Sequence, residues 1–74
     1  MVRMSVHYEN QKENPLLQSI FFEQYDIKGH FHSENGYGHM HVGISNTEEA
    51  KKELMEFVEN HIEGKVTRVD EWEI

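Results

Sequence analysis

The sequence contains no cysteine, which excludes disulfides, thiolate metal ligands and thiol catalysis. Basic residues are also scarce, since 7 Lys and Arg stand against 14 Asp and Glu for a net charge of −7. Nucleic acids and anionic membranes are bound through clustered Lys and Arg, so we expect neither partner. Without a long apolar run or a charged-then-apolar leader, we expect a soluble, cytoplasmic protein.

Proline and glycine are few as well, with one Pro and five Gly, and no linker or repeat divides the chain. We therefore predict one domain spanning residues 1–74. A chain of this size buries only roughly 60% of its unfolded surface, and such small cores often need a metal or a partner subunit. We expect a homodimer or higher homo-oligomer. Without a Gly-rich phosphate loop or a serine in a recognisable catalytic context, we predict no enzymatic activity.

Histidine is what the sequence does have, and it gathers around the stretch 27–44, IKGHFHSENGYGHMHVGI. Asn35-Gly36 favours a type I′ turn between two strands, which pairs Glu34 with Tyr37, Ser33 with Gly38, His32 with His39 and His30 with His41. Because side chains alternate between the faces of a strand, the apolar set Ile27, Phe31, Met40, Val42 and Ile44 occupies one face. The other face carries His30, His32, His39 and His41.

The remaining segments predict two strands and two helices. Residues 1–9 alternate as a half-buried strand, and residues 65–74 form a last strand whose irregular apolar spacing indicates a bulge, with Trp72 capping an edge of the core. The acidic residues Asp70, Glu71 and Glu73 are predicted to be a solvated edge.

A first helix starts at Asn14-Pro15 and buries the apolar positions Leu16, Leu17, Ile20 and Phe21. A second starts at residues 45–49, gains support from a Glu48–Lys52 pair and ends at Gly64 in a left-handed cap. The apolar stripe of this second helix is Ala50, Leu54, Phe57, Val58 and His61 or Ile62. His61 itself is expected to interact with the terminal carbonyls of the helix rather than with a ligand.

This order predicts an α+β, ferredoxin-like βαββαβ fold, a four-stranded antiparallel sheet with two helices on one face. In the usual strand order 4-1-3-2, the first strand lies beside the third, so His7 lies near His39. Five of the six histidines then share the helix-free face of the sheet.

The whole chain resembles the NIL domain, a ferredoxin-like module related to ACT domains. The matching segments are Val2-Arg3-Met4, Asn14 to Ile20, Phe22 to Ile27, Gly38 to Val42 and Glu48 to Gly64. The resemblance implies a small ligand-binding, regulatory module, since NIL domains bind methionine at the tails of methionine-importer ATPases and also occur fused to iron–sulfur ferredoxin modules. It implies a separate transporter ATPase or iron–sulfur protein as a partner.

The segment His39-Met40-His41-Val42 is also similar to the His-x-His strand in the sensor domain of nickel-responsive repressors. That domain has the same βαββαβ order, but its cysteine ligand and DNA-binding arm are missing from this sequence. The similarity implies only that imidazoles on a sheet face can serve as ligands.

Opposed His-x-His strands suit a transition metal ion, Ni, Zn or Cu, because these ions prefer neutral imidazole. We predict a metal site formed by His30, His32, His39 and His41, with His7 as a fifth candidate and Glu9 or Glu34 in reach to complete it. The alternative is a structural, oligomerising or methionine-sensing domain of the NIL type that binds no metal. A third interpretation is a pH switch, in which clustered imidazoles repel one another once protonated.

Overall fold

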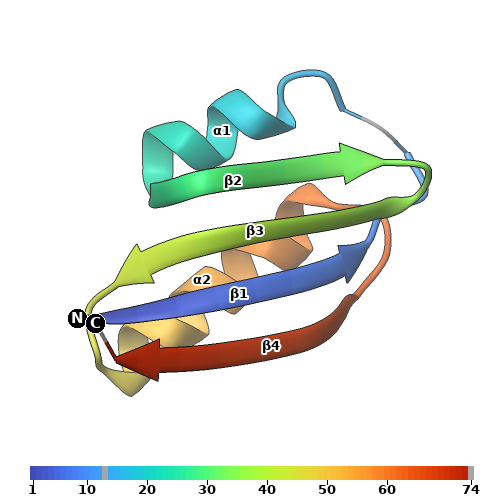
Figure 1. The fold of residues 1–74 in the computed structure, drawn as a ribbon. Helices are drawn as coiled ribbons and strands as arrows, with labels where there is room; N and C mark the ends of the chain where they lie inside the picture. The colour runs from blue at the N-terminus through green and yellow to red at the C-terminus, as the bar shows by residue number, and fades with distance from the viewer. Residues whose placement is uncertain (13, 74) are drawn as a thin grey trace.

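The computed structural model describes residues 1–12 and 14–73. Its elements follow the predicted order: β1 (Val2–Glu9), α1 (Leu17–Gln24), β2 (Asp26–Glu34), β3 (Tyr37–Ile44), α2 (Glu48–His61) and β4 (Val66–Glu73). The strands form one antiparallel sheet in the order β2-β3-β1-β4, and both helices cover the same face (Figure 1). The α+β, ferredoxin-like fold class and the 4-1-3-2 strand order are thus confirmed.

The core lies between the sheet and the helices and follows from the periodicity of each element. Alternate residues of β1 and β3 point to the helices, because successive side chains of a strand face opposite ways. They meet one apolar stripe from each helix. The buried set is Val2, Met4, Val6, Tyr8, Leu17, Phe21, Met40, Val42, Ile44, Leu54, Val58 and Ile62. The opposite face of the sheet carries no helix, and it is therefore free for a site.

Helix α1 begins at Leu17. The predicted first helical residue is Pro15, so the helix starts two residues later than predicted. Asn14 does cap this segment, since its Oδ1 accepts a hydrogen bond from the backbone N–H of Leu16 (2.9 Å) and its carbonyl accepts one from Leu17 (3.0 Å). These bonds hold Pro15 and Leu16 in a turn ahead of the helix. Leu16 is consequently 64% exposed, so its predicted place on the buried stripe is wrong.

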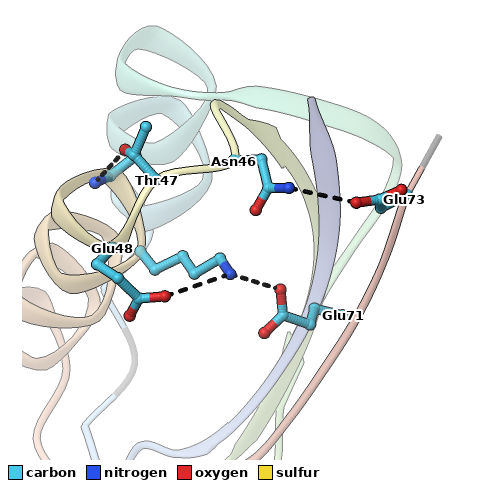
Figure 2. Close-up of polar contacts among 7 residues, drawn as sticks. Asn46, Thr47, Glu48, Glu71 and Glu73 are labelled. Atoms are coloured by element: carbon cyan, nitrogen blue, oxygen red, sulfur yellow. Dashed lines mark hydrogen bonds and ion pairs between the residues drawn. The ribbon is translucent and has the colours of Figure 1, made fainter.

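Helix α2 starts where predicted, with Thr47 as its N-cap. The Thr47 hydroxyl accepts a hydrogen bond from the Ala50 N–H at 3.1 Å (Figure 2). Glu48 and Glu49 occupy the first turn. Lys51, rather than the predicted Lys52, joins this end of the helix to its surroundings: its ammonium lies 2.8 Å from Glu71 of β4 and 3.8 Å from Glu48. The helix therefore docks on β4 through a cation that is only 19% exposed.

The acidic end of β4 takes part in this junction. Besides the Glu71 ion pair, the Asn46 amide donates to Glu73 at 3.4 Å (Figure 2), while Asp70 pairs with Arg68 at 2.9 Å. Glu71 and Glu73 are exposed on an edge strand, as predicted, but the alternation of β4 turns both toward α2, where each also has a polar partner. Partners this far away in sequence leave no local signal.

The predicted left-handed cap at Gly64 is also wrong. Within the described residues, positive φ occurs at Gly29, Asn35 and Gly36 only. Gly64 is instead required for a close approach, because a Cβ there would lie 2.1 Å from the carbonyl oxygen of Glu9. The chain leaves α2 so close to the end of β1 that only glycine fits.

Strand β4 contains the predicted bulge. His7 of β1 pairs with Arg68, whereas the next residue, Tyr8, pairs with Val66, so Thr67 is the extra residue.

No helix in the described part of the chain has the length and apolar character to cross a membrane.

Candidate functional site

The hairpin formed by β2 and β3 sets the register of the histidine face. Asn35 and Gly36 have φ of 54° and 84°, as a type I′ turn requires. The predicted pairs are confirmed from Glu34–Tyr37 through His32–His39 to Phe31–Met40. His32 and His39 therefore lie directly opposite each other on the helix-free face.

Beyond Phe31 the register shifts, and the predicted direct pairing of His30 with His41 is wrong. Ile27 pairs with Val42, so three residues of β2 (Lys28, Gly29 and His30) lie opposite the single residue His41. Gly29 adopts φ of 71° within this bulge, a conformation that glycine adopts without strain. The bulge retains the alternation, so Ile27 and Phe31 still pack against the core.

The central strands bring His7 and His39 together. They are register partners across β1 and β3, as the strand order predicted, and their rings stack with centroids 4.0 Å apart and planes 14° from parallel. Both rings approach the hydroxyl of Ser5: the Ser5 Oγ lies 2.8 Å from the Nε2 of His39 and 3.4 Å from the Nε2 of His7. Ser5 is thus a site residue that sequence reasoning missed.

His30, His39 and His41 form a triangle of rings, which we call the imidazole triangle. The centroid of His39 lies 4.8 Å from those of both His30 and His41, and the third side, His30 to His41, measures 5.6 Å. The three ring pairs are inclined by 56° to 75° rather than stacked. Three rings from two strands therefore surround one position on the open face.

His32 lies at the edge of this group. Its Nε2 is 3.5 Å from Glu34 Oε1, and both side chains are more than half exposed. His61 lies away from the face, on α2, where its Nδ1 is 2.8 Å from the Phe57 carbonyl oxygen and its ring stacks on Phe57 at 4.3 Å. The prediction that His61 interacts with a terminal carbonyl is confirmed.

Crowding lowers the basicity of the central rings. Burial, together with repulsion from the neighbouring histidines His7, His41, His30 and His32, lowers the pKa of His39 from 6.5 to about 4. The pKa of His41 is lowered as well, by burial and then by His30, Arg3 and His7. Both rings are therefore neutral near pH 7, and a neutral imidazole is the form that binds metals.

Trp72 lies on this same face, so its predicted role at an edge of the core is wrong. It pairs with Arg3 across β1 and β4, its ring centroid lies 5.8 Å from that of His41, and it is 41% exposed. The bulge at Thr67 decides this, because one extra residue reverses the facing of the rest of a strand. The indole therefore lies at one side of the histidine layer, which is the group of rings of His7, His30, His32, His39 and His41 on the helix-free face.

The donor atoms of these side chains do not already surround a common point. Among residues 1–12 and 14–73, no group of three or more His, Cys, Asp or Glu side chains is arranged to hold a metal ion. The rings are neighbours, but their nitrogens have to turn toward one another before they share an ion. The energy well for rotation of an imidazole about χ2 is broad, so turning a ring costs little.

The Ser5 hydroxyl and the His39 imidazole lie at the distance of a nucleophile and its base. Ser5 is only 5% exposed, however, because it lies in the middle of the sheet beneath the rings. A hollow of about 370 Å³ lies elsewhere, at the start of α1, where it is bordered by Pro15, Leu17 and Phe31 and reaches His32. A hydroxyl covered in this way is not open to attack the acyl group of a substrate.

Compared with family models, curated proteins and solved structures, the chain has no match. The resemblances to NIL domains and to nickel-responsive sensor domains stay predictions.

Proposed function

We propose that this protein binds a transition metal ion on the open face of its sheet, through His30, His39 and His41. The imidazole triangle, with sides of 4.8, 4.8 and 5.6 Å, carries the proposal. With metal–nitrogen bonds of ~2 Å, ring centroids of histidines that share one tetrahedral ion lie ~5 Å apart. The rings therefore already have the spacing of a ligand set, and only their rotation is needed.

The donor set selects the class of ion. Three imidazoles, in a chain without cysteine, suit Zn²⁺, Ni²⁺ or Cu²⁺ rather than Mg²⁺ or Ca²⁺, which prefer oxygen ligands. His32 is the nearest further donor on β2, since it lies opposite His39 in the register. It becomes a ligand if it gives up its contact with Glu34.

The proposed role is regulatory, because such a small domain responds strongly to what it binds. An ion that binds the folded chain and not the unfolded chain stabilises the fold by ~2.7 kcal/mol at one hundred times its dissociation constant. For a domain of 74 residues, that is a large part of a total of ~5 kcal/mol. Metal binding would therefore change the population of folded protein.

Calorimetric titration of the chelator-stripped protein with Ni²⁺, Zn²⁺ and Cu²⁺ tests the proposal. We expect stoichiometric binding that falls at least about tenfold in the variant H39Q/H41Q, because two of three ligands are removed. The matched control is H61Q, which removes a histidine far from the face and should leave the affinity unchanged. Equal binding by the wild-type protein and H39Q/H41Q would contradict the proposal.

If none of the three metals binds or raises the melting temperature, the alternative of a structural or methionine-sensing module takes its place. The same melting experiment with added methionine identifies that case. A shift with methionine and none with metals would favour the NIL-type role.

A further inference from the structure

Ser5 is a buried polar residue beside the proposed metal site, but it is not one of the proposed ligands. It lies in the middle of β1, opposite His41 of β3 on one side and Asp70 of β4 on the other. The residue is 5% exposed, and its hydroxyl faces the histidine layer from below. A buried hydroxyl needs a hydrogen-bond partner, and here the two partners are the stacked rings of His7 and His39.

The hydroxyl has a single proton to share between these two rings. Both approach it through Nε2, at 2.8 Å for His39 and 3.4 Å for His7. A neutral imidazole carries one N–H donor and one lone pair, and a hydroxyl donates once while it accepts twice. Among the described residues these two nitrogens are the only hydrogen-bond partners of the hydroxyl, so its proton goes to one of them. The other ring, to keep its contact, donates its own Nε2–H to Ser5. The two histidines then hold opposite tautomers.

We infer that Ser5 is a positioning residue: it accepts a hydrogen bond from His39 Nε2–H and donates its own proton to His7 Nε2. His39 then keeps its lone pair on Nδ1, the ring nitrogen not engaged by Ser5, and this nitrogen is its metal ligand. His7 carries its proton on Nδ1 and uses its only lone pair on Ser5, so it lies outside the ligand set. This inference rests on the proposed metal site and narrows the predicted ligands by removing His7.

The assignment follows from where each ring lies. His39 has His30 and His41 as neighbours at 4.8 Å, so a lone pair on its free nitrogen serves the imidazole triangle. His7 is stacked on the other side of His39, on β1. Outer partners that fix the tautomer of a ligating histidine are a general feature of metal sites, and Ser5 is placed to do this for His39.

Nuclear magnetic resonance of the metal-free protein tests the tautomers directly. Long-range ¹H–¹⁵N correlation at pH 7.5 should show His39 protonated at Nε2 and His7 protonated at Nδ1. In S5A both rings should shift toward a mixture of tautomers, whereas S5T, which retains the hydroxyl, should restore the wild-type pattern. A His39 protonated at Nδ1, or an S5A spectrum unchanged at both rings, would overturn the inference.

Metal affinity gives the second measurement. We expect S5A to weaken binding of Zn²⁺ by about 10- to 100-fold, and S5T to recover most of this loss. H7Q, whose amide oxygen can still accept the Ser5 proton, should lose much less affinity than H39Q, which removes a ligand. A loss in H7Q as large as in H39Q would overturn the inference. If the wild-type protein binds no metal, the proposed function fails, while the tautomers of the metal-free protein still decide the role of Ser5.

Discussion

His39 is the most crowded side chain of the histidine face, with His7 stacked on it and His30 and His41 in contact with it. Burial, and then the repulsion that a charge would meet from the neighbouring histidines, lowers its pKa to about 4. In the unfolded chain the same group has its ordinary pKa of 6.5. Folding therefore excludes a proton that the unfolded chain binds readily.

Stability should accordingly depend on pH. The pKa of His39 is lower in the folded protein than in the unfolded chain. The free energy of unfolding of the metal-free protein should therefore have its highest value above pH 6.5 and fall as the pH decreases from 6.5 toward 4. Urea denaturation at intervals between pH 7.5 and 4.5 measures this fall, and H39Q should flatten the upper part of the curve, before the carboxylates titrate. Equal slopes in the two proteins would contradict the assignment to His39.

The course of strand β2 depends on the backbone conformation of one residue, Gly29. Gly29 adopts φ of 71° in the bulge, and apart from its two chain neighbours no atom of the described residues lies within 4 Å of the place where a Cβ would be. A substitution there is strained by its conformation and not by a clash. G29A should therefore lower the free energy of unfolding by about 1 kcal/mol, and G29N by less, because asparagine tolerates this region better.

Chemical denaturation of G29A, G29N and the wild-type protein gives this ranking. Since the bulge places His30 beside His39, metal affinity should fall in the same order. If G29A were as stable as the wild-type protein, Gly29 would not hold this conformation in solution.

The start of α2 depends on a side chain. Thr47 caps the first turn through its hydroxyl (Figure 2), so T47A should destabilise the protein by about 1 kcal/mol, while T47D retains an acceptor and should cost less. Thermal melting of both variants checks the difference. Because Thr47 lies far from the histidine layer, metal binding by the folded T47A protein should be unchanged, which makes it a control for the face variants.

In the whole molecule, charge is divided between the two sides of the sheet. Strand alternation and register place three cationic residues on the open face, namely Arg3, Lys28 and Arg68. They also place four anionic residues there, namely Glu9, Asp26, Glu34 and Asp70. The net charge of −1 on the open face leaves −6 of the total of −7 on the rest of the chain. The open face is thus the side on which two copies repel each other least.

We therefore expect two copies to associate through their open faces. A standard interface buries ~800 Å² on each partner, which requires most of one face of a molecule whose Cα trace spans 31 by 20 Å in its two longer dimensions. Sedimentation velocity should show a dimer that W72E disrupts, because a carboxylate replaces the exposed indole of that face. The control F22E places the same charge on α1, and a monomeric wild-type protein would contradict the expectation.

The sequence was sufficient wherever a local rule decides the outcome. The type I′ turn at Asn35-Gly36 follows from two residues that tolerate positive φ, and the position of His32 opposite His39 follows from that turn. The sorting of apolar and histidine side chains onto opposite faces follows from the twofold period of a strand. The order of elements then brought His7 beside His39.

The tertiary structure alone decided what depends on partners distant in sequence. Ser5 meets His39 across 34 positions, the bulge at Thr67 moves Trp72 to the histidine face, and the path beside Glu9 demands glycine at position 64. The periodicity of a strand tells which face a side chain occupies, but it carries no information on which neighbour's atoms it meets there. That depends on the register and bulges of adjacent strands, which are fixed only when the whole sheet packs.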